Sequence, residues 1–255
     1  MQDEQSPVSC QRTSDMKEGS VLIRKSMSYV DLGNGIVYEQ DVLAMGTDSV
    51  LLADFVLPAR GRVCDLGCGA GAVMLLMALK GGSTALFDGV ELRAGAVEKA
   101  RRNIERAGLS DRMSVYQADL RTLHETFASA AYTVVVSNPP YMPVGGSIPP
   151  EEEDACIART ERCCTVNDLC AAAAYLLQYG GRFCVVYPPE RLSALMRVMR
   201  ENGIEPKRLR LFCRRQNTRP SLVLVEGRRG GKEGLEILPS LFGDSEEFQK
   251  VSRTF

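Results

Sequence analysis

The sequence predicts an α/β fold: a seven-stranded, mostly parallel β-sheet with helices on both faces and an antiparallel hairpin at one edge. From about residue 60 onward, short apolar runs with strand character alternate with helical stretches, and this alternation is typical of a parallel sheet covered on both sides. A glycine-rich turn from Asp65 to Gly71 follows the first run. Such turns connect a strand to a helix and let the backbone approach a ligand closely. The last two runs have no helix between them, which predicts the antiparallel hairpin.

Before this alternating region, the chain predicts a polar tail and two small elements. Residues 1–20 are polar, with Pro, Ser and mixed charges, and we expect them to be disordered. The stretch 29–38 alternates around a Gly-Asn-Gly turn, which predicts a hairpin. Polar residues with capping side chains precede 49–56, so we expect a short helix there that ends before Pro58.

The remaining elements predict one main domain over 59–242, with residues 21–58 packed on it and a C-terminal tail over 243–255. The expected strands lie at about 62–66, 85–91, 113–117, 132–137, 182–187, 208–213 and 221–226. The clearest helical stretches lie at 70–80, 94–107, 166–179 and 189–202.

Composition indicates a soluble protein with one sizeable core. The chain has 255 residues, of which 45% are hydrophobic and 25% charged, as in ordinary globular proteins. The longest apolar stretch, 70–79, is too short to cross a bilayer, and the polar start has no hydrophobic signal region. We therefore expect no membrane partner and a cytoplasmic location. The nine cysteines lie partly inside predicted strands, which favours reduced, buried side chains over a disulfide framework.

The cysteines between 156 and 170 do not predict a metal site. Cys156, Cys163, Cys164 and Cys170 include an adjacent pair but no Cys-x-x-Cys spacing, and His124 is the only histidine in the chain. Structural zinc sites usually show paired ligands at close, regular spacing. We expect no metal and interpret these cysteines as helix and loop residues.

Acidic residues at the ends of three successive strands predict an adenosyl ligand with an amino-acid end. Asp65 precedes the glycine-rich turn, where it suits a cationic amino group. Glu91 ends the next strand, and its carboxylate can accept hydrogen bonds from both ribose hydroxyls. Asp119 follows the third strand and is placed to accept from an adenine amino group, or else caps a helix. The glycines expected to approach the ligand are Gly67, Gly69 and Gly71; a nicotinamide site would more typically show Gly-x-Gly-x-x-Gly.

The tetrapeptide Asn138-Pro139-Pro140-Tyr141 predicts a site for a planar amino group. It follows the apolar strand 132–137, which the prolines end because proline donates no ladder hydrogen bond. Asn138 and the Pro139 carbonyl can accept from the two hydrogens of an NH2 group, and the Tyr141 ring can stack on a flat base or amide. The alternative, that these residues only make a rigid turn, is weaker after a sheet strand.

Together, these motifs resemble the class I S-adenosylmethionine-dependent methyltransferases over about residues 60–190. A longer resemblance, over about 28–242, is to the bacterial tRNA(Val) adenine-N(6) methyltransferase family. Its segments are Gly46-Thr-Asp-Ser-Val-Leu-Leu-Ala-Asp-Phe55, Asn138 to Tyr141, Tyr187-Pro-Pro-Glu-Arg-Leu192, Glu205-Pro-Lys-Arg208 and Leu222-Val-Leu-Val-Glu-Gly227. The resemblance implies a Rossmann-like fold, S-adenosylmethionine as cofactor and tRNA as substrate, and it implies that Thr47, Asp48 and Asn138 join the cofactor site. One departure is Arg159-Thr160-Glu161, where some members carry Arg-His-Glu.

A basic stretch near the C-terminus predicts where RNA binds. Residues 206–232 carry nine Lys and Arg opposed only by Glu226, although the net charge of the chain is −1. Arginine neutralises phosphates and stacks on bases, and the candidates are Arg208, Arg210, Arg214, Arg215 and Arg219. A solvated hairpin without RNA contacts is the alternative.

Other substrates keep the same chemistry. A glutamine side chain also offers a planar NH2, so a protein-glutamine methyltransferase of the release-factor type is the main alternative. Those enzymes usually carry a helical domain before the glycine-rich turn, and this chain offers only a polar tail, a hairpin and one helix there. A guanine amino methyltransferase acting on rRNA is a third possibility. A non-catalytic RNA-binding module would require lost site residues, and every expected residue is present. The sequence does not predict an oligomeric state.

Overall fold

A computed structural model describes residues 29–32, 36–41, 45–80, 84–139 and 164–253. The expected disordered tail over 1–20, and Pro140 and Tyr141 of the tetrapeptide, lie outside the described residues. No helix in the described part of the chain is both long and apolar enough to cross a membrane.

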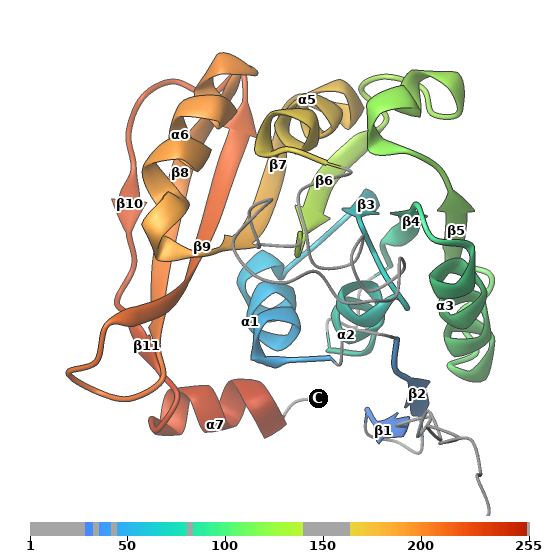
Figure 1. Cartoon of the computed structure of the whole chain (residues 1–255), viewed down its shortest axis with the longest axis horizontal. Helices are drawn as coiled ribbons and strands as arrows, with labels where there is room; N and C mark the ends of the chain where they lie inside the picture. The colour runs from blue at the N-terminus through green and yellow to red at the C-terminus, as the bar shows by residue number, and fades with distance from the viewer. Residues whose placement is uncertain (1–28, 33–35, 42–44, 81–83, 140–163, 254–255) are drawn as a thin grey trace, which may run out of the picture.

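The main sheet has the predicted parallel core (Figure 1). Strand β9 is antiparallel to both of its neighbours, β7 and β8, whereas the pairs β7–β6, β6–β3, β3–β4 and β4–β5 are all parallel. In spatial order these strands are β8 (Ile204–Cys213), β9 (Pro220–Arg229), β7 (Leu177–Tyr187), β6 (Tyr132–Ser137), β3 (Arg62–Leu66), β4 (Leu86–Glu91) and β5 (Met113–Gln117). The mostly parallel sheet and its antiparallel hairpin are confirmed.

The edge beyond β8 differs from the prediction. Two short strands, β10 (Glu236–Ile237) and β11 (Leu241–Phe242), pair with β8 in parallel, so the sheet has nine strands in the described part of the chain. Strands of two residues are too short to show an alternating pattern, so they could not be predicted from the sequence.

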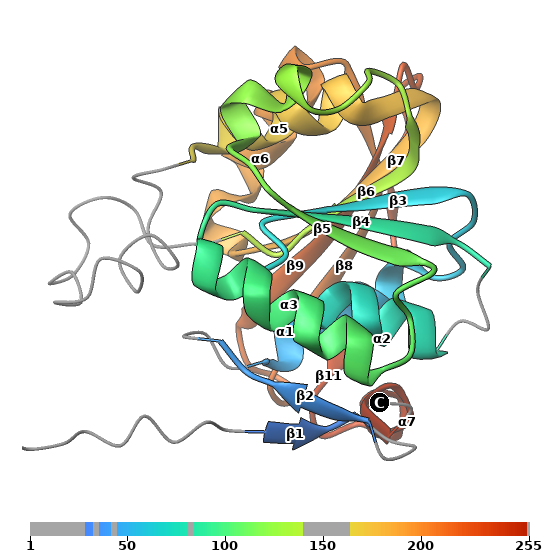
Figure 2. The same ribbon diagram turned by 90° about the vertical axis from the view of Figure 1, so that its right-hand side faces the viewer.

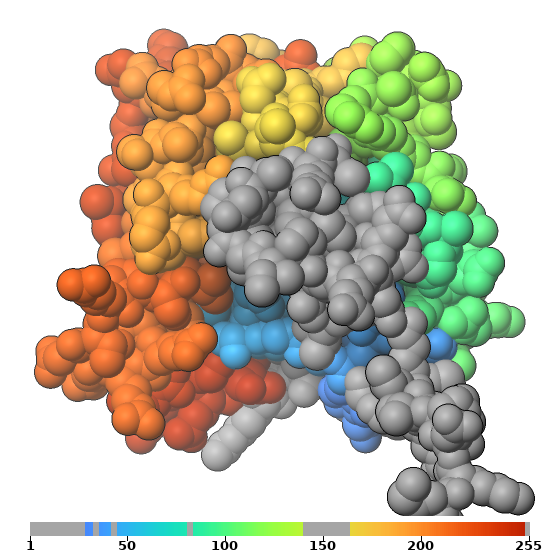
Figure 3. All heavy atoms as spheres, viewed as in Figure 1, coloured from blue at the N-terminus to red at the C-terminus, as the bar shows by residue number. Residues whose placement is uncertain are grey.

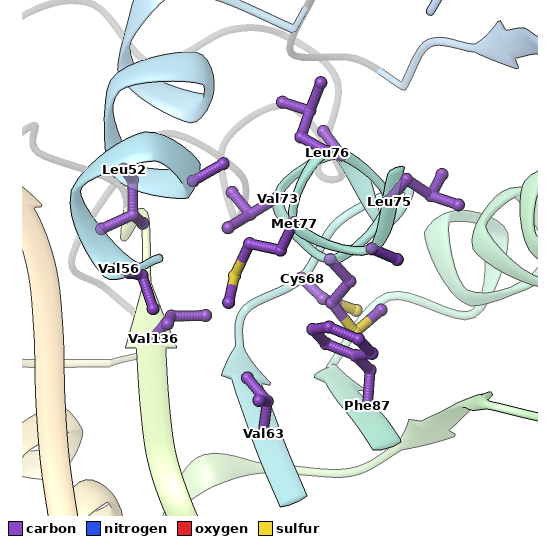
Figure 4. Packing of buried hydrophobic residues seen from close by; sticks show 14 of the residues in the cluster. Leu52, Val56, Val63, Cys68, Val73, Leu75, Leu76, Met77, Phe87 and Val136 are labelled. Carbon is purple, nitrogen blue, oxygen red and sulfur yellow. The ribbon is translucent and has the colours of Figure 1, made fainter. Parts of the chain in front are cut away.

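Helices cover both faces of the sheet, as Figure 2 shows. Alternate strand residues point to opposite faces: Val134 and Val136 of β6 belong to one buried cluster, and Val135 belongs to the other. The first cluster includes α1 (Thr47–Val56), α2 (Ala72–Lys80) and α3 (Ala94–Arg106), and the second includes η1 (Leu120–Glu125), α5 (Val166–Leu176) and α6 (Leu192–Glu201). Figure 4 shows side chains of α1 and α2 packed on β3, β4 and β6.

Two helix boundaries differ from the prediction for local reasons. The helix expected over 166–179 ends at Leu176, and residues from Leu177 onward belong to β7. Leu177 has φ −70° and ψ 135°, an extended conformation that ends the helix and begins the pairing with Tyr132 of β6. The helix expected over 189–202 begins as a 3-10 turn, η2 (Pro189–Arg191), because consecutive prolines remove helix donors.

The N-terminal hairpin is confirmed as a separate two-stranded sheet of β1 (Tyr29–Asp31) and β2 (Val37–Glu39). It is fixed to α3 by polar contacts. Glu39 forms ion pairs with Arg102 at 2.9 Å and Arg106 at 3.1 Å. The buried Asn103 side chain accepts from the Glu39 N–H and donates to the carbonyls of Glu39 and Ala70. Asn103 thus connects the hairpin to the glycine-rich turn.

The C-terminal segment, for which the sequence predicted only a tail, contains the helix α7 (Glu246–Arg253). Its Phe248 ring lies 5.3 Å from the ring of Phe212 in β8, and Val251 is buried. The helix therefore packs on the same face of the sheet as α1.

Candidate active site

The parallel strands bring the predicted site residues to one edge of the sheet. Asp65 near the end of β3 is level with Gly89 of β4 and Val136 of β6. Glu91 ends β4, and Asn138 follows β6 directly. In open α/β sheets, ligands bind at this carboxyl edge.

The glycine-rich turn leaves open space beside two of its three glycines. Gly67 has φ +74° and Gly69 has φ +55°, and a Cβ at either position would meet nothing within 4 Å. The N–H of Gly67 donates to the Val90 carbonyl at 2.9 Å, which ties the turn to β4. The third glycine is different, because a Cβ at Gly71 would meet Ala100 and Met74 in ordinary contact. The structure places Gly71 in helix packing rather than beside open space.

Gly89 of β4 leaves room for side chains of the turn and of α2, and the sequence analysis did not predict this role. A Cβ at Gly89 would lie 2.7 Å from the Cys68 Sγ and 2.7 Å from the Met74 Cε. Such distances require one of these groups to move. A glycine two residues before a strand-end acid was the signal available in the sequence.

Glu91 is buried and held in place by three donors. Its Oε2 accepts from the Gly69 N–H at 2.9 Å, and its Oε1 accepts from the Arg93 N–H at 2.9 Å. The Arg93 side chain lies 3.2 Å from Oε1 and forms a second ion pair with Asp41 at 2.6 Å. Each carboxylate oxygen has more than one acceptor site, so Glu91 can still accept from a diol. Arg93 and Asp41 were not predicted, since their pairing joins residues distant in sequence.

Asp65 is the most unusual titratable group of the site. Its side chain is 1% exposed, and its Oδ2 has no hydrogen-bond partner among the described residues. Burial, reinforced by the nearby Glu91 charge, raises the pKa of Asp65 from 3.8 to about 8. A buried carboxylate without a partner is costly, and a cationic group bound beside it would remove that cost.

These residues fit an S-adenosylmethionine molecule. The orphaned Asp65 oxygen suits a cationic amino-acid end, the space beside Gly67 and Gly69 suits close approach of a ligand, and Glu91 suits a ribose diol. Two buried carboxyl groups, Asp65 and Glu91, lie at the turn, where they would repel the negative charge of a diphosphate.

Asp119 has its acceptor groups engaged with a neighbour. It is the N-cap of η1, accepting from the Arg121 N–H at 2.9 Å and from the Arg121 guanidinium. The hydrogen bond from the Arg121 side chain is the main reason that the pKa of Asp119 is lowered. The helix-cap alternative is therefore present in the structure, and contact with adenine remains a prediction.

Asn138 lies beside the start of α1. Its amide nitrogen is 3.4 Å from the Ser49 hydroxyl, and Ser49 is buried. Asp48 accepts from the Ser49 N–H at 2.9 Å, whereas Thr47 is exposed. Packing of α1 against β7 and β9 thus brings this motif to the end of β6. Ser49 was missed as a site residue, although it directly follows the predicted Thr47 and Asp48.

The basic stretch divides into paired and unpaired residues. The Arg208 guanidinium donates to the Phe55 carbonyl at 3.0 Å and lies over the Phe55 ring. Arg210 donates to the Pro239 carbonyl and pairs with Glu247. Three arginines are exposed instead and form no side-chain hydrogen bond or ion pair within the described structure: Arg214, Arg215 and Arg219.

The cysteines that the structure describes are free thiols. Cys64, Cys184 and Cys213 are buried free thiols, as predicted. Among residues with described positions, no group of three or more His, Cys, Asp or Glu side chains could hold a metal ion. Cys156 and Cys163 lie outside those positions.

Comparisons of the sequence with known proteins show which family the chain belongs to. The methyltransferase small domain family matches residues 32–201. The tRNA1(Val) (adenine(37)-N6)-methyltransferase of Cronobacter sakazakii is 35% identical over 170 residues, which cover 66% of this chain and 68% of that protein. The protein of the same name from Dickeya chrysanthemi is 31% identical over 205 residues, covering 80% of this chain and 79% of its own.

A solved structure supports the fold independently. A predicted O-methyltransferase from Agrobacterium tumefaciens superposes with a TM-score of 0.66 at 20% identity, covering 81% of this chain and 96% of that one. At that identity the likeness concerns the fold alone, and it confirms the predicted Rossmann-like methyltransferase architecture. From the sequence matches, this chain belongs to the methyltransferase small domain family and, within it, to the family of tRNA1(Val) (adenine(37)-N6)-methyltransferases.

Proposed function

We propose that this enzyme transfers a methyl group from S-adenosylmethionine to the exocyclic amine of an adenine in tRNA. The observation that carries the proposal is the position of Asn138. It directly follows β6, which pairs with β3, so an amine held at Asn138 lies at the sheet edge beside the turn that follows Asp65. The curated relatives' names supply the substrate class.

The residues of the chain have separate tasks in this reaction. The cofactor, when bound, supplies an electrophilic methyl group on a sulfonium. Asp65 binds its amino-acid end, and Glu91 binds its ribose hydroxyls. The space beside Gly67 and Gly69 lets the cofactor lie close to the backbone of the turn. Asn138 and the Pro139 carbonyl accept the amine hydrogens, which draws the nitrogen away from planarity and leaves its lone pair available. Orienting two reactants can contribute about 7 to 11 kcal/mol of barrier reduction.

No strong base is needed in this scheme. Adenine's amino group becomes acidic once its nitrogen carries the new methyl group, so a proton can leave to solvent after transfer. His124 is exposed in η1, and the proposal gives it no role.

The direct test is methyl transfer to an unmodified tRNA transcript, followed by mass spectrometry of the nucleosides. We expect N6-methyladenosine to form only when protein and S-adenosylmethionine are both present. Formation of N2-methylguanosine, or methylation of a release-factor glutamine instead of tRNA, would leave the amino-group site standing but overturn the substrate.

Glu91 provides a test of cofactor binding. Replacing Glu91 by Ala should weaken S-adenosylmethionine binding about ten- to a hundredfold, because a charge-assisted hydrogen bond contributes about 1.5 to 3 kcal/mol. The same change removes acceptors of the Gly69 and Arg93 N–H groups, so part of the loss comes from a loosened turn. Calorimetry measures the affinity, and the unfolding midpoint of the same variant measures how far the turn has loosened. Unchanged affinity in Glu91→Ala would exclude the proposed contact with ribose.

Tyr141 lies outside the described residues, and its role is proposed from the sequence. Tyr141→Ala should lower kcat/KM, because stacking on a base is worth about 1 to 3 kcal/mol. Tyr141→Phe keeps the ring and should retain most activity. Equal losses in both variants would show that the hydroxyl, and not the ring, is what the reaction needs.

A further inference from the structure

The turn between β8 and β9, residues 214–219, carries three of the exposed arginines of the chain: Arg214, Arg215 and Arg219. We call it the arginine turn. In Figure 3, orange atoms of this part of the chain stand out from the surface at the lower left, to the side of the blue atoms of α1. Three other arginines of the 206–232 stretch contact groups of the protein itself. Arg208 and Arg210 do so as described above, and Arg229 donates to the carbonyls of Ala174 and Leu177.

The arginine turn has a defined backbone. Asn217 has φ +58°, a left-handed conformation that asparagine tolerates better than most residues. The Thr218 hydroxyl donates to the Arg215 carbonyl at 2.7 Å and accepts from the Arg215 N–H at 3.3 Å. The Gly243 N–H donates to the Cys213 carbonyl at 2.9 Å, which supports the base of the turn. The three arginines therefore lie on a turn whose backbone is held by hydrogen bonds.

Strand register places the arginine turn on the side of the sheet where Asn138 lies. Ser137, at the end of β6, is level with Val185 of β7, Val225 of β9 and Leu209 of β8. From that level β8 continues to Cys213, which is about 13 Å farther at ~3.3 Å per residue. β8 lies three strands from β6, about 14 Å across the sheet. The arginine turn thus projects past the carboxyl edge, to one side of the candidate active site.

Acidic residues beside the arginine turn do not pair with its arginines. Glu247 of α7 pairs with Arg210, which leaves Asp244 and Glu246 as the exposed acids at the start of α7. Neither forms an ion pair with an arginine of the turn in the described structure. Three cations on six residues are suited to a run of phosphates, which arginine binds with two parallel hydrogen bonds.

We propose that the arginine turn is an RNA-backbone contact that holds the strand adjoining the target adenine. This inference rests on the proposed function, since it assumes that the substrate at Asn138 belongs to an RNA chain. The arginine turn lies far enough from Asn138 to bind phosphates a few nucleotides from the reacting base, without contacting the reacting atoms. Phosphate contacts of this kind position a substrate and do not specify its bases.

The test compares two triple variants with the same change in charge. One is Arg214→Gln/Arg215→Gln/Arg219→Gln. The control is Arg60→Gln/Arg228→Gln/Lys232→Gln, whose residues are exposed and lie at or beyond the opposite, amino edge of the sheet. Dissociation constants for unmodified tRNA are measured at several salt concentrations, together with methyl transfer and unfolding midpoints.

We expect the arginine-turn variant to bind tRNA at least about tenfold more weakly at low salt. The slope of log K against log salt should fall by about 2, because each lost phosphate contact on a single strand removes ~0.7. KM for tRNA should rise, whereas kcat and the affinity for S-adenosylmethionine should stay within twofold of wild type. The control variant should keep the wild-type slope.

The outcomes separate this inference from the proposed function. Wild-type methylation of adenine with unchanged tRNA binding in the arginine-turn variant would overturn the inference and leave the function intact. Equal weakening in both triple variants would also overturn it, because a general charge effect explains that result. A wild-type enzyme that modifies a protein glutamine but no tRNA would overturn both.

Discussion

Replacing Asn138 by Ala should lower kcat for adenine methylation about 10²- to 10³-fold, with S-adenosylmethionine affinity within about twofold of wild type. The reason is that the Asn138 amide accepts a hydrogen of the amine more strongly as that hydrogen becomes acidic in the transition state. Interactions that strengthen in the transition state affect turnover more than binding. The loss of one preorganised polar partner of a reacting group typically has this size. Stopped-time assays with tRNA, read out as N6-methyladenosine, measure kcat.

Ser49 gives this prediction a sharper form. Its hydroxyl lies 3.4 Å from the Asn138 amide nitrogen, so it can fix which side of the amide faces the substrate. Ser49→Ala should reduce kcat several-fold with little change in KM. In the Asn138→Ala background, the same Ser49→Ala change should have no further effect on kcat, because residues that act as a unit are not additive. Additive losses would show that Ser49 supports the fold and does not act through Asn138, and full turnover by Asn138→Ala would exclude the proposed mechanism.

The fold could be predicted because its signals are local and repeated. Each main strand is a short apolar run, and its neighbours along the chain are helical, so the parallel sheet follows from the pattern alone. Boundaries failed where one or two residues decide the backbone. The extended backbone at Leu177 ended α5 three residues earlier than the apolar pattern indicated. The short strands β10 and β11 depend on β8 as a template.

The site could be predicted only in part, because its side-chain partners come from distant segments. Strand-end acids are visible in sequence, and Asp65 and Glu91 do reach one edge of the sheet. That Glu91 shares Arg93 with Asp41 follows from the docking of the N-terminal segment, which no local pattern contains. The same holds for the basic stretch: Arg210 finds Glu247 in α7, whereas Arg214, four residues later, meets no such partner in the described structure. Charge counting treats the two as equal.

Asp65 should respond to mutation in opposite directions in the free and the bound protein. In the free enzyme its carboxyl has a pKa of about 8, against an ordinary value of 3.8, because it is buried beside Glu91. Between these pH values the folded state holds a proton that the unfolded state has lost. The free energy of unfolding should therefore decrease as pH rises from about 4 to 8, with a slope of at most about 1.4 kcal/mol per pH unit from this group.

Asp65→Asn removes the titrating group and keeps the size of the side chain. The free variant should lose most of this pH dependence and should be more stable than wild type near pH 8, where wild type buries a charge without a partner. Cofactor binding should instead weaken about ten- to a hundredfold, because the variant cannot form an ion pair with the cofactor's amino group. Denaturant unfolding at pH 5.5, 7 and 8.5 measures the first effect, and calorimetry measures the second.

The same group predicts a proton signal in binding. Near pH 7 the Asp65 carboxyl of the free enzyme holds its proton, and the ammonium of S-adenosylmethionine favours the ionised form, so binding should release up to one proton. The apparent binding enthalpy of wild type should then depend on the ionisation enthalpy of the buffer, and that dependence should disappear in Asp65→Asn. A variant that is less stable than wild type at pH 8.5, yet binds the cofactor normally with the same buffer dependence, would show that Asp65 serves the fold alone. A more stable variant with weakened binding is the result expected of a cofactor-binding carboxylate, because burial of its unpartnered charge lowers the stability of the free protein while the same charge strengthens binding of the cofactor.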